Sequence, residues 1–304
     1  ITTLPGAGTL QNNGVNVAAG QSVSVADINA GKLVFTPTGH GNGAGYAAFA
    51  FQVQDDGGTL SGGVDTDTTP RTLTVDVTSI NDAPVGTNNT VTTLEDTNYT
   101  FTAADFGFTD PDDAVANALA AVKITMLPAA GTLTDNGVIV TAGQFVSVAD
   151  INAGKLVFTP VANANGAAYA SFTFQVQDDG GTANAGVDLD TAARTMTVNV
   201  TSVNDAPVGT SNTVTTLEDT AYTFTAADFG FTDPADLPVN ALTAVKITTL
   251  PGAGTLQNNG VNVTAGQFVF LADIDAGNLK FTPAANANGA GYASFTFQVR
   301  DDGG

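Results

Sequence analysis

The sequence predicts an all-β fold in which β-sandwiches repeat in tandem along the chain. Three observations predict it: an internal repeat of fixed length, short β-branched and aromatic segments bounded by turn residues, and the lack of any helical period. The 304 residues are too many for one ordinary sandwich and are about right for two to three domains.

The repeat is the strongest signal in the chain. Residues 1–8, Ile-Thr-Thr-Leu-Pro-Gly-Ala-Gly, return with small changes at 124–131 and at 247–254, so one period is 123 residues long and carries no insertion. The same interval relates Asn-Asp-Ala-Pro-Val at 81–85 to 204–208, and Leu-Glu-Asp-Thr at 94–97 to 217–220. Copies this similar indicate a recent duplication.

One period contains seven or eight predicted strands. Each is a short run rich in Val, Thr, Ile, Phe or Tyr, and Gly, Asn, Asp and Pro separate the runs. The Asp-Asn-Gly turn at 135–137 suits the positive φ of a tight hairpin. The pattern predicts an immunoglobulin-like Greek-key sandwich, with strands at 90–94, 99–103, 121–127, 138–141, 145–148, 155–159, 170–176 and 195–201.

Two proline-containing segments mark the predicted domain boundaries. Pro84 and Pro207 cannot donate to a central β-ladder, so residues 81–84 and 204–207 are expected to be short linkers. The expected domains are residues 1–82, 84–205 and 207–304. The first lacks two opening strands and the last lacks its closing strand, so we expect either a longer array cut at both ends or strands supplied by neighbouring molecules.

Composition limits the classes of partner. The net charge is −21, from 29 Asp and Glu against 8 Lys and Arg, and a chain of this sign repels nucleic acid and anionic lipid but attracts multivalent cations. The chain has no Cys, which excludes disulfides and thiolate metal sites. No apolar run reaches the length of a membrane span, so no membrane insertion is expected within this segment.

Three motifs resemble those of a known group of repeats. They are Val-Asn-Asp-Ala-Pro-Val at 203–208, Leu-Glu-Asp-Thr-Ala-Tyr at 217–222, and Phe-Thr-Phe-Gln-Val-Gln-Asp-Asp-Gly at 172–180. The chain resembles the cadherin-like and chondroitin-sulfate-proteoglycan-type repeats of giant bacterial adhesins and repeats-in-toxin surface proteins. The resemblance implies an extracellular, cell-surface location and a stalk that calcium stiffens, with neighbouring repeats of the same chain as partners.

The predicted strand directions sort the acids into two junctions between domains. Because consecutive strands alternate in direction, loops that are distant in sequence meet at the same end of a sandwich. The upper junction of the middle domain is expected to collect Asn81, Asp82, Asp110, Asp113, Asp178 and Asp179. The lower junction is expected to collect Glu95, Asn204, Asp205, Asp233, Asp236, Asp301 and Asp302.

Calcium is the cofactor that these groups predict. Ca²⁺ prefers six to eight hard oxygen ligands, and crowded carboxylates without Lys or Arg repel one another. The resemblance implies the same ligand scheme, a first-strand Glu, an Asn-Asp linker and two Asp-bearing loops, although the spacing departs from it at residues 110–113. The alternative is that Asp, Asn and Gly here only form solvated turns.

Other acids and the single histidine have other expected roles. Asp27, Asp150 and Asp273 precede Gly-bearing turns and are expected to cap the backbone. Whether Asp65, Asp67, Asp188 and Asp190 are accessory ligands stays open. His40 aligns with Asn163 and Asn286 in the other copies, so it is expected to be a surface loop residue.

The sequence predicts a structural protein and no enzyme. It has no nucleophile elbow, phosphate-binding loop or histidine-rich metalloprotease motif, and no Trp for a sugar platform. The leading hypothesis is a calcium-stiffened stalk of a secreted bacterial surface adhesin. The alternative is an extracellular filament or surface layer, built by homotypic contacts in which subunits complete one another by strand addition.

Overall fold

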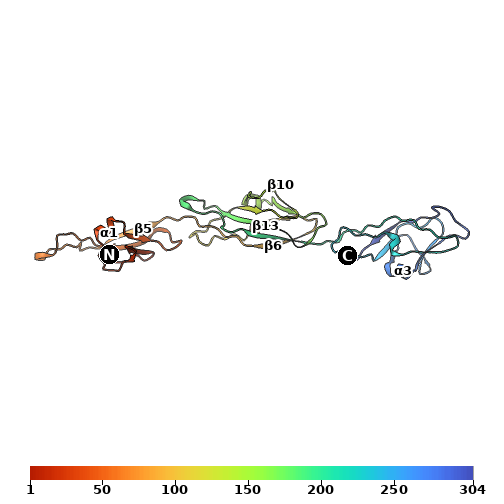
Figure 1. Ribbon diagram of the computed structural model, residues 1–304, viewed down its shortest axis with the longest axis horizontal. Helices are drawn as coiled ribbons and strands as arrows, with labels where there is room; N and C mark the ends of the chain where they lie inside the picture. Colours follow the sequence, from red (N-terminus) through yellow and green to blue (C-terminus); the bar gives the residue numbers. More distant parts are fainter. Residues whose placement is uncertain (304) are drawn as a thin grey trace.

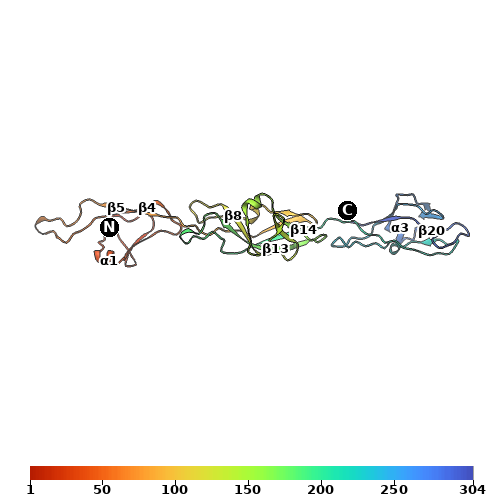
Figure 2. The same ribbon diagram turned by 90° about the horizontal axis from the view of Figure 1, so that it is seen from above.

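The computed structural model describes residues 1–303, and its sheets form three groups that follow one another along an extended rod (Figures 1 and 2). We call them the first unit (β1–β5, residues 9–77), the middle unit (β6–β14, residues 89–201) and the third unit (β15–β21, residues 222–300). The predicted all-β class is confirmed, since strands far outnumber helical segments.

The middle unit is a sandwich of two sheets. The four-stranded sheet has the order β10 (Val138–Ile139), β9 (Thr132–Asp135), β12 (Leu156–Thr159), β7 (Tyr99–Thr100). The five-stranded sheet has the order β11 (Phe145–Ser147), β8 (Leu119–Met126), β13 (Gly166–Asp178), β14 (Arg194–Thr201), β6 (Asn89–Leu94). Neighbouring strands are antiparallel except β14 and β6, which are parallel.

Aromatic side chains fill the space between the two sheets of the middle unit. Phe101, Phe106 and Phe174 are fully buried, and Phe172 is nearly so. The ring of Phe106 meets that of Phe174 edge to face with 4.9 Å between centroids, a geometry that aromatic pairs favour. These phenylalanines therefore form the packed core of the middle unit.

The first and third units repeat parts of this architecture. The first unit has one sheet of β2 (Val15–Asn16), β1 (Thr9–Asn12) and β3 (Leu33–Thr36), and a second of β4 (Gly43–Phe51) and β5 (Arg71–Val77). The third unit has β15 (Tyr222–Thr223), β20 (Leu279–Thr282), β17 (Thr255–Asn258) and β18 (Val261–Asn262), facing β19 (Phe268–Phe270), β16 (Ala244–Ile247) and β21 (Phe297–Arg300).

Within residues 1–303, each outer unit lacks strands that the middle unit has, and its packing and strand pairing are less complete. Met196 of β14 is fully buried, whereas Leu73, which occupies the same repeat position in β5, is 42% exposed. Residues 212–217 correspond to β6 but form no strand, because no counterpart of β14 pairs with them within residues 1–303.

Short helical turns lie between the strands, which the sequence did not predict. Three five-residue α-helices repeat at the same position: α1 (Val25–Asn29), α2 (Val148–Asn152) and α3 (Leu271–Asp275). Four 3₁₀ turns complete the set: η1 (Leu60–Gly62), η2 (Ala103–Phe106), η3 (Ala183–Ala185) and η4 (Ala226–Phe229). Segments this short do not reveal a 3.6-residue period, and η2 takes over the end of the strand expected at 99–103.

Candidate metal sites at the two junctions

The first junction, which corresponds to the upper junction expected from the sequence, joins the linker before the middle unit to loops of that unit. The Asn81 side chain donates to Asp178 Oδ1 at 3.0 Å and to the Val187 carbonyl at 2.8 Å. The backbone N–H of Asp82 donates to Asp113 Oδ2 at 3.2 Å. The linker is therefore fixed to two separate loops of the middle unit, as the strand directions predicted for these residues.

Asn117, which the sequence analysis did not single out, organises this junction. Its side chain donates to Asn81 Oδ1 and, at 3.1 Å, to Asp113 Oδ2, and its backbone N–H donates to Asp110 Oδ2 at 2.5 Å. The counterpart Asn240 donates to Asn204 and to Asp233 in the same way. The sequence contains one signal for this role, because Asn117 and Asn240 occupy the same position in two copies of the repeat.

Two buried carboxylate oxygens of the first junction have no hydrogen-bond partner. They are Oδ1 of Asp110 and Oδ2 of Asp178, whose residues are 7% and 2% exposed. Burial, and then the charge of Asp110, raises the pKa of Asp178, even though Gly180 and Asn81 donate to it. Burial, with the charges of Asp110 and Asp82, likewise raises the pKa of Asp113. These shifts indicate negative charge that the protein itself does not neutralise.

The second junction, which corresponds to the expected lower junction, has the same contacts between linker and aspartate loops and adds a glutamate from the middle unit. Oxygens of Glu95, Asp205 and Asp236 lie within 4.8 Å of one another. The backbone N–H of Asp205 donates to both carboxylate oxygens of Asp236 at 3.2 Å, and Asn204 donates to Asp301 Oδ1 at 3.4 Å. Three segments therefore converge: the residue after β6, the linker and a loop of the third unit.

Glu95 is held in place by the outgoing chain. It is 2% exposed and accepts from Val203 N at 2.5 Å, Ser202 Oγ at 3.1 Å and Asn165 Nδ2 at 2.9 Å. Burial raises its pKa, but these three hydrogen bonds outweigh burial and lower the pKa below its usual value. Glu95 is therefore an ionised oxygen donor in a fixed position.

For Asp205 and Asp233, hydrogen bonds do not offset the effect of burial on the pKa. Burial and the charges of Asp236, Asp96 and Glu95 raise the pKa of Asp205, and burial with the charges of Asp236 and Asp301 raises that of Asp233. Oδ2 of Asp205 and Oδ1 of Asp233 are buried atoms without a partner. The orphaned atoms are all oxygens, which fits a hard cation such as Ca²⁺.

Two of the expected ligand positions face solvent and bond to the backbone. Asp179 accepts from Ala118 N at 2.8 Å and Asp302 accepts from Ala241 N at 2.7 Å, and both residues are exposed. They close the loops in which the buried Asp178 and Asp301 lie.

A glycine in each late loop makes room for the linker asparagine. A Cβ at Gly180 would lie 1.8 Å from Oδ1 of Asn81, and one at Gly303 would lie 1.5 Å from Oδ1 of Asn204. No side chain fits there, so the glycine of the Asp-Asp-Gly motif is required for the close approach of linker and loop.

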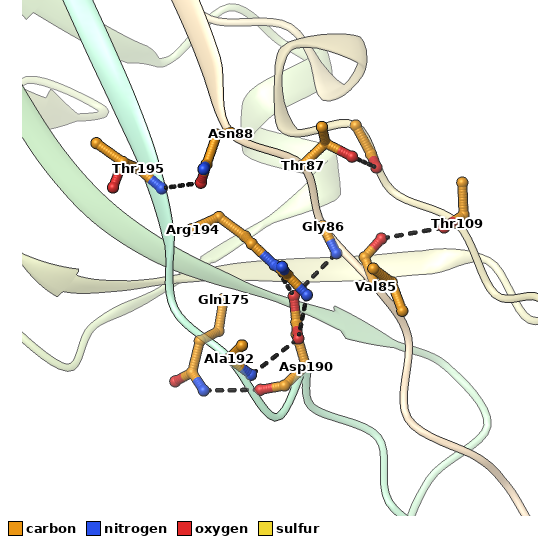
Figure 3. Close-up of polar contacts among 11 residues, drawn as sticks. Val85, Gly86, Thr87, Asn88, Thr109, Gln175, Asp190, Ala192, Arg194 and Thr195 are labelled. Carbon is orange, nitrogen blue, oxygen red and sulfur yellow. Dashed lines mark hydrogen bonds and ion pairs between the residues drawn. The ribbon is translucent and has the colours of Figure 1, made fainter.

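Three further expectations have clear outcomes. Asp190 does not face the acid cluster but pairs with Arg194, Nε to Oδ2 at 2.8 Å (Figure 3), and Asp67 pairs with Arg71 at 3.1 Å. The expectation that Asp150 caps the backbone is wrong, because Ser147 is the N-cap of α2 and accepts from Asp150 N at 3.1 Å. The Asp150 side chain accepts instead from Ser147 Oγ and Lys155 Nζ. His40 lies on the surface, as expected, and its Nδ1 is 2.7 Å from Asp82 Oδ2.

These features define a chain of Ig-like β-sandwiches in tandem, with acid-rich junctions between them. The chain belongs to the bacterial Ig domain family, whose model matches residues 81–190 and 204–304. Neither a comparison with curated proteins nor one with solved structures finds a match. The α-helices within residues 1–303 have five residues each, far fewer than the ~20 that a membrane-spanning helix needs.

Proposed function

We propose that this chain is a calcium-stiffened stalk of a secreted bacterial surface adhesin, which holds a binding module away from the cell in adhesion or biofilm formation. The observation that carries the proposal is the convergence of Glu95, Asp205 and Asp236 within 4.8 Å. Each comes from a different part of the chain, so an ion held by all three ties the middle unit, the linker and the third unit together.

The charge balance explains why an ion would matter for stiffness. Two carboxylates about 4 Å apart repel by ~1 kcal/mol in bulk water and by ~4 kcal/mol at the effective dielectric near a protein surface. His40 is the only basic side chain paired with any of the junction acids in the part of the chain described. Without a cation the junction acids push the units apart, and with Ca²⁺ the same oxygens draw them together.

The middle unit, the third unit and both linkers supply the residues that would hold the ions. At the first junction these are Asn81, Asp82, Asp110, Asp113 and Asp178. At the second they are Glu95, Asn204, Asp205, Asp233, Asp236 and Asp301. Asp179 and Asp302 complete the proposed set as outer residues that support the loops.

A calcium titration of the whole chain tests the proposal. We expect calcium to raise the melting temperature and EDTA to lower it, because a ligand that binds only the folded state stabilises it. Small-angle scattering should show a rod of fixed length in calcium and a shorter, bent average in EDTA. An unchanged melting curve together with an unchanged scattering profile would sink the proposal.

Two variants make the titration specific. Glu95→Gln keeps the size of the side chain but removes a charge at the second junction, so it should weaken the calcium response. Asp150→Asn is the matched control, because Asp150 pairs with Lys155 far from both linkers in sequence and is no part of either junction. An equal loss of response in both variants would show that charge in general, and not this junction, binds the ion.

A second function has one observation in its favour. The outer edge of β21 has no strand partner within residues 1–303. A hollow of about 450 Å³ lies beside this strand, and its lining includes Gly209, Phe297 and Val299 together with Lys246 of β16 and Phe268 of β19. In the middle unit β14 covers the corresponding edge of β13. A filament or surface layer built by strand addition between subunits would use this edge, and fibres seen by electron microscopy in calcium would favour it over the stalk.

A further inference from the structure

The third unit carries two exposed aromatic rings on one face of one sheet. In the sheet of β19, β16 and β21, Phe268 and Phe270 point away from the core, because side chains alternate along a strand and Val269 between them is fully buried. Phe268 is 40% exposed and Phe270 is 57% exposed. Two rings on one outer face form an apolar surface that the core of the unit does not use.

Two cations lie beside these rings. Lys246 is directly opposite Phe268 in the sheet, and Arg300 and Phe270 are both directly opposite Ala244. The Lys246 Nζ and the Arg300 guanidinium each lie 5.7 Å from the centre of the Phe268 ring, within the range of cation–π attraction. Neither cation takes part in any ion pair found within residues 1–303. We call these four side chains, Phe268, Phe270, Lys246 and Arg300, the aromatic–cationic face.

The copies of the repeat differ at this face although they are similar elsewhere. At the position of Phe270, the first and middle copies have Ser24 and Ser147. At the position of Arg300, the middle copy has Gln177. The two differences add a ring and a positive charge to the same face of the same sheet, so the third unit has a surface that the middle unit lacks.

The change to Phe270 works against the stability of the unit. Ser24 and Ser147 are the N-caps of α1 and α2, and their side chains accept from Asp27 N and Asp150 N, both at 3.1 Å. Phe270 is the N-cap of α3, and its side chain makes no such bond. Serine is strongly preferred over apolar residues at an N-cap, so folding alone does not explain an exposed ring at this position.

Groups that can bond to hydroxyls continue the same face. Gln298 lies directly opposite Lys246, on the side away from β19. Next to this row, Thr296 Oγ1 lies 2.6 Å from Thr248 Oγ1, and both residues are exposed. The hollow of about 450 Å³ beside β21 has a volume within the range of small-ligand sites. Its lining includes Gln298 and three residues of the aromatic–cationic face, Lys246, Phe268 and Arg300.

A further strand beside β21 would leave this face open. In the middle unit, β14 pairs with β13, which is the counterpart of β21. Phe145, which corresponds to Phe268, is still 45% exposed there. A neighbouring strand extends a sheet sideways and does not cover its face, so the aromatic–cationic face is accessible with or without such a strand.

We propose that the aromatic–cationic face binds an acidic saccharide. Arg300 and Lys246 match the carboxylate of a sugar acid, the Phe270 ring offers an apolar surface to the C–H groups of the sugar ring, and the Gln298 amide can bond to its hydroxyls. Nucleic acid and anionic membranes carry dense negative charge, which a chain of net charge −21 repels. The proposal goes beyond the stalk function and needs no metal ion.

NMR titration of the isotope-labelled whole chain tests the proposal, with a disaccharide of glucuronic acid and N-acetylglucosamine as the probe. The titration is done in EDTA, so that no calcium can bridge the sugar to the junction acids. We expect amide shifts in β16, β19 and β21. The methyl ester of the same disaccharide, which has no charge, should bind at least about tenfold more weakly. No shifts on this face, or equal binding of the ester, would overturn the proposal.

Variants that restore the residues of the middle copy make the test specific. Arg300→Gln and Phe270→Ser should each weaken binding of the disaccharide at least about tenfold. Phe270→Ser should also slow hydrogen exchange in α3, because it restores the cap, so its loss of binding cannot come from unfolding. Lys280→Gln is the matched control, because it removes a charge from β20 in the other sheet of the unit, and it should bind as the native chain does. Native binding by both restored variants would contradict the proposal.

Two further titrations separate this ligand from the alternatives. N-acetyl-Glu-Phe amide carries one carboxylate and one ring, and equal binding of this peptide would replace the saccharide by an acidic protein partner. Repeating the disaccharide titration in calcium separates the face from the calcium proposal. Shifts of β16, β19 and β21 in both EDTA and calcium support the saccharide site, whatever calcium does at the junctions. Shifts that appear only in calcium would overturn it.

Discussion

Replacing Arg194 by Met should expose how much the middle unit depends on its buried ion pair. The substitution keeps the length of the side chain but leaves the Asp190 carboxylate, 1% exposed, with only the N–H groups of Gly86 and Ala192. Removing one partner of a buried pair typically costs about 3–5 kcal/mol. Because 28% of the Arg194 side chain is exposed, we expect roughly 2–3 kcal/mol, at or below the lower end of that range.

Hydrogen exchange measures this loss in the middle unit alone. The chain has three units and no Trp, so a single unfolding transition cannot be assumed, whereas amides of β6 and β14 report on their own unit. Since every 1.4 kcal/mol is a factor of ten, exchange through unfolding should accelerate about 30- to 150-fold. The matched control is Lys155→Met, which breaks a half-exposed pair with Asp150 of similar length, 2.7 Å, and should cost about 0–1 kcal/mol.

The pH dependence provides a second check on Arg194→Met. Burial raises the pKa of Asp190, but the bonds from Arg194, Ala192 and Gly86 outweigh it and lower that pKa. In the native protein, this stabilisation is present above the unfolded pKa of about 3.9 and is lost as the pH falls below it. The difference between variant and wild type should therefore shrink in acid. Equal costs for Arg194→Met and Lys155→Met, or a difference independent of pH, would refute the reasoning.

Three other predictions concern the junctions. Asp205→Asn should weaken calcium binding at the second junction by about 10- to 100-fold, the range seen even for residues that only support a metal ligand, and calorimetry should show the first junction unchanged. In EDTA, mild acid should stabilise the chain, because burial and like charge raise the pKa of Asp178 and Asp233 in the folded state. The free energy of unfolding should therefore fall as the pH rises from about 4. A series of melting curves that shows no such fall, or the same fall in calcium, would contradict this prediction. Gly180→Ala should displace Asn81, because its Cβ would lie 1.8 Å from that side chain. Small-angle scattering in calcium should then show a more flexible first junction. The control Gly6→Ala, whose Cβ would lie in open space, should leave the scattering profile unchanged.

The sequence by itself determined the class of fold and the grouping of the acids. The 123-residue interval between copies, together with the alternation of strand direction, is enough to place Glu95, Asp205 and Asp236 at one junction. These inferences depend on local signals, because residues that are adjacent in the sequence determine where strands and turns form.

Pairings between distant segments were decided only by the tertiary structure. Nothing in residues 89–94 indicates that they pair in parallel with residues 196–201, since strand propensity does not specify a partner. β9 escaped prediction because its four residues, Thr132–Asp135, lie directly between two Gly-bearing turns and include a single apolar side chain, Leu133. The fold alone also brought Asn117 to the linker and turned Asp190 towards Arg194 and away from the junction, because burial selects the partner that best compensates a charge.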